Sequence, residues 1–222
     1  MSRSLCVAVL LLVGCGAPSR ATPTPAPRST EPPPPPLVRL AAISGPHATF
    51  EAACGEAHAC RALDVQPEMA AEPPFLELRL VAVTQDDEEG RCAIALRTEA
   101  GWFLGTQAEE SALCAQPSYV EVGSATVTSS HDVAVVEVTV DHHTKNDDDS
   151  GEHVWTSVCG VAAKGPWCTA HLTTACDPYV CVDDEVRWTR SLELVGDGTF
   201  VLSTTSASEA ARRETGRFRL PR

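Results

Sequence analysis

The densest group of side chains with metal-binding chemistry lies in residues 141–153. Imidazole nitrogens suit zinc, copper or nickel, and clustered carboxylates suit calcium. The candidate metal ligands in this segment are Asp141, His142, His143, Asp148 and His153. A metal-dependent hydrolase or a metal-binding protein is therefore one function that the sequence leaves open.

The segment matches a helix-loop-helix calcium motif only in part. Asn146, Asp148 and Ser150 occupy the first, third and fifth places of the motif, and Gly151 occupies the sixth. The twelfth place, which needs a bidentate glutamate, holds Ser157. The motif therefore does not predict a calcium site.

A transition-metal site in the same segment meets a geometric limit. If a strand runs through His142 and His143, their side chains point to opposite faces, so only one of them can join His153. We interpret the segment as a solvated loop between two strands, because acidic runs also occur at residues 86–89 and 183–185. No cofactor is expected.

The four tryptophans, Trp102, Trp155, Trp167 and Trp188, offer a second kind of site. An exposed coplanar pair of them would indicate a carbohydrate-binding sandwich. Each lies in or beside an apolar strand, and aromatic residues make up only 5% of the chain. We therefore expect them to pack in the core.

Motifs for common enzyme classes are missing from the sequence. It contains no nucleophile elbow, phosphate loop, dinucleotide fingerprint or zincin helix. No catalytic residue is assigned, and a non-enzymatic protein is favoured.

The first fifteen residues carry an export signal. Arg3 precedes an apolar run at residues 7–13, which is too short to span a bilayer. The run ends in Leu12-Val13-Gly14-Cys15, which resembles the signal peptide of bacterial lipoproteins. The resemblance implies cleavage before Cys15, which would then carry fatty acyl chains, palmitate among them, and anchor the protein stably in a membrane. Gly16 stands where an inner-membrane retention signal has aspartate, so the resemblance implies the outer membrane of the cell envelope.

A tether follows the anchor. Residues 16–36 are rich in proline, threonine, serine and alanine, and they end in five consecutive prolines. Such a segment cannot bury a core and should extend roughly 60 Å at about 3.1 Å per residue. We therefore divide the chain into a signal peptide (residues 1–14), a lipidated cysteine with its tether (residues 15–40) and one domain (residues 41–222).

The domain is strongly acidic. Four of the 17 basic residues and one of the 30 acidic residues precede Ala41, which leaves 13 basic and 29 acidic residues in the domain. Such a surface repels phosphate backbones, so nucleic acid is excluded as a partner. The lipid alone would hold the protein at the membrane.

Eight cysteines remain in the mature domain, and in an exported protein an even number indicates disulfides. Spacing favours pairs between sequence neighbours, because short loops close easily. The expected pairs are Cys54 with Cys60, Cys92 with Cys114, Cys159 with Cys168, and Cys176 with Cys181.

Alternating apolar and polar residues predict an all-β domain. Expected hairpins cover residues 92–104, 119–140, 154–173 and 186–203, and residues 50–54 should form a short helix. About eight to ten short antiparallel strands favour a sandwich or a partly closed barrel. We therefore expect a disulfide-stapled, lipid-anchored envelope protein that acts as an interaction or structural lipoprotein, with an envelope protein or a glycan as its partner.

Overall fold

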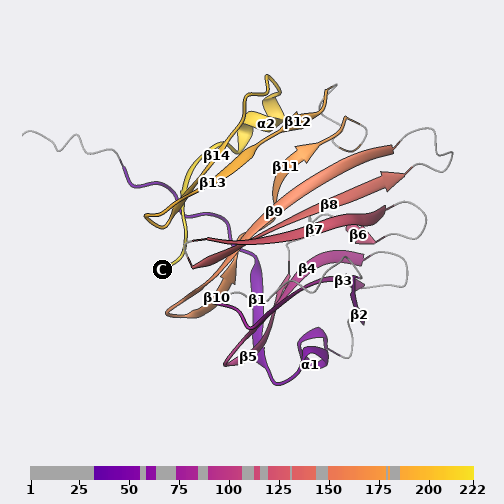
Figure 1. Ribbon diagram of the computed structural model, residues 1–222, viewed down its shortest axis with the longest axis vertical. Helices are drawn as coiled ribbons and strands as arrows, with labels where there is room; N and C mark the ends of the chain where they lie inside the picture. The colour runs from indigo at the N-terminus through magenta and orange to yellow at the C-terminus, as the bar shows by residue number, and fades with distance from the viewer. Residues whose placement is uncertain are drawn as a thin grey trace, which may run out of the picture. The chain divides into compact units, whose positions relative to one another are not determined.

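The computed structural model describes residues 33–55, 59–63, 74–84, 90–106, 113–115, 120–130, 132–143, 150–178, 180 and 186–222. The chain divides into two compact units after Pro34, and the folded unit begins at Pro35. All pairings between its named strands are antiparallel, which confirms the all-β prediction. The strands form three sheets, and none of them closes into a barrel (Figure 1).

The first sheet contains the N-terminal strands. These are β1 (Ala42–His47), β2 (Ala59–Ala62), β3 (Glu77–Thr84), β4 (Gly90–Thr98), β5 (Gly101–Thr106) and β6 (Leu113–Ala115). Their order is β1-β5-β4-β3-β2, with β6 paired to β4. The predicted helix is present as α1 (Phe50–Cys54), which begins where the Thr49 hydroxyl accepts a hydrogen bond from the Ala52 N–H.

The second sheet contains the longest strands. It is built from β7 (Val120–Ser130), β8 (Val133–His143), β9 (Ser150–Ala162), β10 (Gly165–Cys168), β11 (Leu172–Cys176) and β12 (Trp188–Thr189). The order is β12-β11-β9-β8-β7, and β10 pairs with the far end of β9.

The third sheet is small. It comprises β13 (Ser191–Val195), β14 (Thr199–Ser203) and β15 (Gly216–Arg219) in that order, and α2 (Glu209–Arg213) lies between the last two strands in sequence. Among the described residues, neither helix is long or apolar enough to cross a bilayer.

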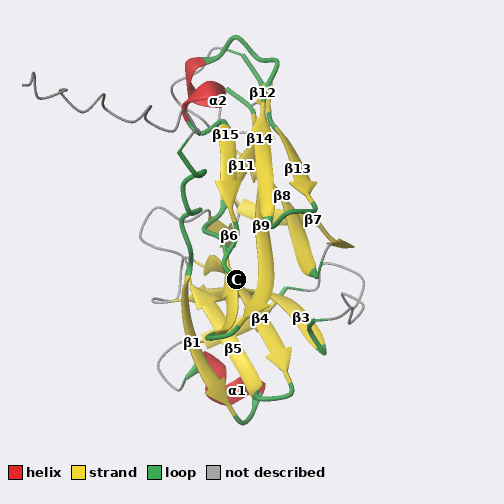
Figure 2. Ribbon diagram, turned by 90° about the vertical axis from the view of Figure 1, so that its left-hand side faces the viewer, coloured by secondary structure: helices red, strands yellow, loops and turns green. Residues whose placement is uncertain are grey.

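The second sheet is covered on both faces. Val136, Val138 and Val140 of β8 pack with Trp155 against the first sheet, while Val133 and Val135 pack toward the third sheet. Successive residues of a strand point to opposite faces, so a strand buried on both sides needs the nearly continuous apolar sequence that β8 has. Figure 1 shows the strands of the second sheet between the other two groups, and Figure 2 gives the view turned by 90°.

Three of the expected disulfides are confirmed. Cys54–Cys60, Cys92–Cys114 and Cys159–Cys168 are bonded, with Cα–Cα distances of 5.5, 5.0 and 4.1 Å. In the fourth expected pair, Cys176 is disulfide-bonded, and Cys181 lies outside the described residues.

The end of the expected tether is part of the folded unit. The Pro36 carbonyl accepts a hydrogen bond from the Arg219 N–H, and the Val38 N–H donates to the Arg219 carbonyl. The Ala41 N–H then donates to the Cys168 carbonyl, before the chain enters β1. Residues 36–47 therefore contact the third, second and first sheets in turn.

Candidate functional site

The expected solvated loop is shorter than residues 141–153, because β8 runs through His142 and His143 and β9 begins at Ser150. In the extended strand the two imidazoles point to opposite faces. His142 is partly buried on the face of β8 that carries Val140. His143 is exposed, with its Nε2 3.5 Å from Glu121 Oε1 on β7. Asp141 shares the face of His143, and its carboxylate lies beside Gly123. The candidate ligands therefore divide between two faces.

His142 and His153 are brought together on the inner face. The register places Val140 opposite His153, so both strands present these side chains on one side. The two rings are 6.3 Å apart between centroids, and His153 Nε2 lies 3.2 Å from Thr173 Oγ1. Asp148 lies outside the described residues.

A third histidine, which the sequence analysis did not assign, lies next to the pair of His142 and His153. His171 stacks on Trp155, with ring centroids 3.6 Å apart. It precedes β11, and only the pairing of β11 with β9 brings it to Trp155. No local pattern around His171 could reveal this contact, because it depends on long-range register.

Burial keeps the imidazoles of these three histidines neutral. Desolvation, with a smaller effect from neighbouring His142, lowers the pKa of His153 to about 4. Desolvation and neighbouring His153 lower the pKa of His171 to about 3. Burial also lowers the pKa of His142, against the opposing effect of Asp141. Neutral imidazole is the form that binds metals, yet the described residues contain no group of three histidine, cysteine or acidic side chains placed to hold one.

The tryptophans are buried, as expected. Trp102, Trp155, Trp167 and Trp188 are all less than 8% exposed. The carbohydrate-binding alternative required an exposed coplanar pair of tryptophans, and these four residues do not provide one. Trp102 packs on the outer face of the first sheet, where its ring meets Phe50 of α1 at 5.2 Å.

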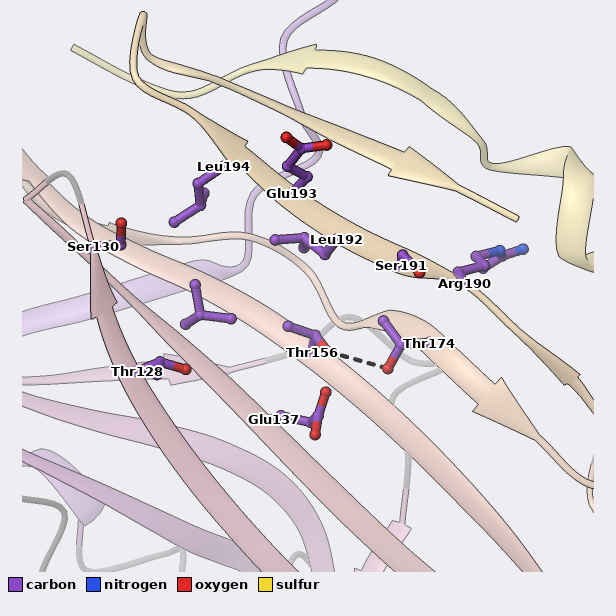
Figure 3. A pocket seen from close by; sticks show the side chains of 11 residues that line it. Thr128, Ser130, Glu137, Thr156, Thr174, Arg190, Ser191, Leu192, Glu193 and Leu194 are labelled. Atoms are coloured by element: carbon purple, nitrogen blue, oxygen red, sulfur yellow. Dashed lines mark hydrogen bonds between the residues drawn. The ribbon is translucent and has the colours of Figure 1, made fainter. Parts of the chain in front are cut away.

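An accessible cavity lies elsewhere, between the second and third sheets. It has a volume of about 530 Å³, within the range of ligand pockets. Figure 3 shows the side chains that line it, with β13 on one side and the strands of the second sheet on the other. The lining residues are Thr128, Ser130, Val135, Glu137, Thr156, Thr174, Arg190, Ser191, Leu192, Glu193 and Leu194. We call this cavity the intersheet cleft.

Hydroxyl groups and one carboxylate dominate the floor of the cleft. Thr156 Oγ1 and Thr174 Oγ1 are 3.1 Å apart, and the Thr174 hydroxyl donates to the Val154 carbonyl. Glu137 is exposed and forms no hydrogen bond or ion pair with another described residue. Leu192 and Leu194 of β13 are partly buried and face the second sheet, which forms the floor of the cleft.

No family model, curated protein or solved structure matches this chain.

The remaining sequence-predicted site is the lipidation site Cys15, which lies outside the described residues. Sequence reasoning missed the intersheet cleft because its walls come from strands that are up to 66 residues apart, from Thr128 to Leu194. One local signal was present. Glu137 places an exposed carboxylate on the face of β8 that is opposite to the buried Val136 and Val138.

Proposed function

We propose that this protein is a lipid-anchored, non-enzymatic interaction protein of the bacterial cell envelope, attached to the outer membrane through Cys15. The lipoprotein-like signal, the proline-rich tether and the acidic domain support this proposal together. The tether would carry the domain away from the lipid surface, and a binding partner would meet the domain there.

The single observation that carries the proposal is the intersheet cleft. Its lining includes hydroxyls, the carboxylates of Glu137 and Glu193, and two leucines, which can orient a partner and exclude water from it. The Thr156 and Thr174 hydroxyls already bond to each other, so neither is aligned with a histidine as an activated nucleophile would be. The arrangement therefore favours recognition over group transfer.

The anchor can be tested by removing the acylated sulfur. Cys15→Ser should move the protein from the membrane fraction to the soluble envelope fraction. Ser19→Ala, a substitution a few residues beyond the anchor, is the matched control and should stay in the membrane. Recovery of Cys15→Ser in the membrane pellet after a high-salt wash would contradict the lipid anchor.

The use of the cleft can be tested in intact cells by site-specific photo-crosslinking. A photoreactive side chain at Thr128 or Ser191, both exposed beside the cleft, should give an adduct of discrete mass. The same group at Lys164, an exposed residue in the turn between β9 and β10, is the matched control. Equal labelling at all three positions, or none at the cleft positions, would overturn the proposal.

A metal-dependent function is the alternative, because His142 and His153 share one face as neutral imidazoles. We expect no stoichiometric metal in protein purified without chelators. Zinc or copper that is bound stoichiometrically by the wild type and lost in the variant His142→Ala/His153→Ala would favour this alternative over the interaction protein.

A further inference from the structure

The intersheet cleft exists because one run of chain changes sheets. Within residues 188–195, Trp188 and Thr189 pair with β11, and the Arg190 N–H still donates to the Thr174 carbonyl at 2.6 Å. From Ser191 onward the chain pairs with β14 instead. The second and third sheets therefore separate at Arg190, and the cleft lies in the angle between them.

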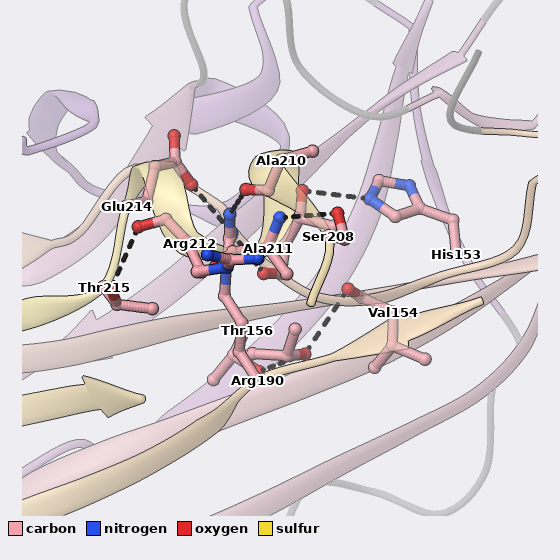
Figure 4. A network of polar contacts seen from close by, with 12 residues as sticks. His153, Val154, Thr156, Arg190, Ser208, Ala210, Ala211, Arg212, Glu214 and Thr215 are labelled. Atoms are coloured by element: carbon pink, nitrogen blue, oxygen red, sulfur yellow. Dashed lines mark hydrogen bonds and ion pairs between the residues drawn. The ribbon is translucent and has the colours of Figure 1, made fainter. Parts of the chain in front are cut away.

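The branch point is held by the Arg190 side chain, which is only 3% exposed. Its Nη1 donates to the Thr173 carbonyl at 2.8 Å and to Glu214 at 2.9 Å, and its Nε donates to the Ala211 carbonyl at 2.7 Å. Figure 4 shows this network, which ties β11 to helix α2. The cleft is therefore preformed, and little ordering entropy is lost when a ligand enters it.

The roof of the cleft is a free strand edge. β13 is an end strand of its sheet, so the backbone groups that face away from β14 have no strand partner within the described part of the chain. An extended peptide can add to such an edge through its main chain, while its alternate side chains enter pockets beside the edge.

The charge of the cleft selects the kind of side chain that enters it. Glu137 stands on the floor without an ionic partner among the described residues. Arg190 is the one cation among the described lining residues, and its guanidinium is already bound to Glu214. The cleft is therefore complementary to a cation, and the surrounding threonines can accept its remaining hydrogen bonds.

We propose that the intersheet cleft binds an extended peptide segment that adds as a strand to the free edge of β13 and places a lysine or arginine side chain against Glu137. This inference rests on the proposed interaction function and names the partner class. The main chain would supply sequence-tolerant affinity, and Glu137 would supply the selection for a basic residue.

The test uses the mature lipidated protein in detergent and capped heptapeptides of alternating threonine and valine. The central residue is lysine, norleucine or glutamate, and binding is measured by titration calorimetry. We expect saturable binding of the lysine peptide with a Kd below about 1 mM, which corresponds to roughly 4 kcal/mol. The norleucine peptide should bind about tenfold more weakly, and the glutamate peptide should not bind.

Variants and peptide chemistry separate the two parts of the proposal. Glu137→Gln should weaken the lysine peptide about tenfold and leave the norleucine peptide unchanged, whereas Glu99→Gln, in the exposed turn between β4 and β5, should change neither. Backbone N-methylation on one alternate set of peptide amides should abolish binding, and methylation of the other set should be tolerated. This alternation is the signature of strand addition and needs no change to the protein.

Three results would overturn the inference. They are no binding of any peptide, equal binding of the lysine and norleucine peptides, or binding of a soluble glycan oligomer that is lost in Glu137→Gln. If cross-linking in cells labels the cleft while peptides fail, the interaction function stands and the peptide partner is wrong. If both experiments fail, the proposed function fails as well.

Discussion

His153 and His171 place two imidazoles against an apolar core, and both stay neutral because burial disfavours the charged ring. In the unfolded chain the same residues take up protons near pH 6.5. Below that pH the unfolded state binds more protons than the folded state, so the stability of the fold decreases as the pH falls. The loss begins near pH 6.5 and continues down to about pH 4 for His153 and about pH 3 for His171.

We therefore predict that the free energy of unfolding falls by a few kcal/mol between pH 7 and pH 4. Urea denaturation at a series of pH values measures it. His171→Phe, which keeps a flat ring against Trp155, should reduce the slope of stability against pH. Thr126→Ala, which changes an exposed residue without a titratable group, should leave the slope unchanged. A flat profile in the wild type would mean that these rings are not buried as described.

At the scale of single elements, helix α2 depends on a residue outside it. Its N-terminus is capped by the Ser208 hydroxyl, which accepts from the Ala211 N–H, but its C-terminal carbonyls at Ala210 and Ala211 accept from the buried Arg190 side chain. Such a short helix is not stable alone in water. The guanidinium therefore fixes both α2 and the branch between the second and third sheets.

We predict that Arg190→Ala destabilises the fold by about 3 kcal/mol, because it leaves several buried carbonyls without a donor. Arg213→Ala, which removes only an exposed pair with Glu209, should cost no more than about 0.5 kcal/mol. Thermal melts of both variants measure the difference. Equal effects would show that the Arg190 network does not hold the branch.

The hairpin of β9 and β10 depends on a glycine. Gly160 lies opposite Trp167, and a Cβ atom added there would come within 2.5 Å of the indole ring. We predict that Gly160→Ala costs about 1–3 kcal/mol by forcing the ring to move. In a Trp167→Leu background the same substitution should cost less, since the smaller side chain leaves room for the methyl group. Additive effects in this double-mutant cycle would argue against the contact.

Local sequence predicts the elements whose contacts join residues that are close together in the chain. The hairpins of β4 with β5, β7 with β8, and β13 with β14 are confirmed, and so are α1 and three disulfides between sequence neighbours. The described residues nevertheless contain fifteen strands rather than eight to ten. Strands such as β6 and β12, with three and two residues, are too short to show a period of two.

The candidate site was predicted less completely than the fold. The opposite directions of His142 and His143 follow from strand geometry and are confirmed by the register of β8. His171 lies close to His153 only because β11 pairs with β9. The chain pairs with β11 at Trp188 and Thr189 and with β14 from Ser191 onward, and these pairings also join distant segments. Such pairings are set by packing of the whole core, and no local propensity encodes them.

At the scale of the whole molecule, the hydrophobic core is divided into several clusters, and disulfides add to the stability that these clusters provide. The closed loops have sequence separations of 6, 22 and 9 residues for Cys54–Cys60, Cys92–Cys114 and Cys159–Cys168. In the chain-entropy description a longer loop restricts the unfolded state more. The bond between Cys92 and Cys114 should therefore contribute most of the three.

We predict that Cys92→Ala/Cys114→Ala lowers the free energy of unfolding by about 3 kcal/mol and Cys54→Ala/Cys60→Ala by about 2 kcal/mol. Full reduction should lower the melting temperature further than either pair. Calorimetric melts with and without reductant, with reduction verified by mass, measure these effects. An unchanged midpoint after full reduction would contradict the prediction.

If the chain is anchored through Cys15 as proposed, the pairing of residues 36–41 with the third and second sheets would determine how the domain carries force. A pull on the tether acts first on the hydrogen bonds between Pro36, Val38 and Arg219, and then on those with Cys168 and Ala170. A partner held at β13 would load the same third sheet from its other edge. If Cys15 anchors the chain and a partner binds at β13, as proposed, the load between them would pass through the third sheet, where Pro36 and Val38 bond to Arg219 of β15. It would bypass the first sheet, with α1 and the Cys54–Cys60 bond. The first sheet would stay mechanically unloaded while the tether is under tension.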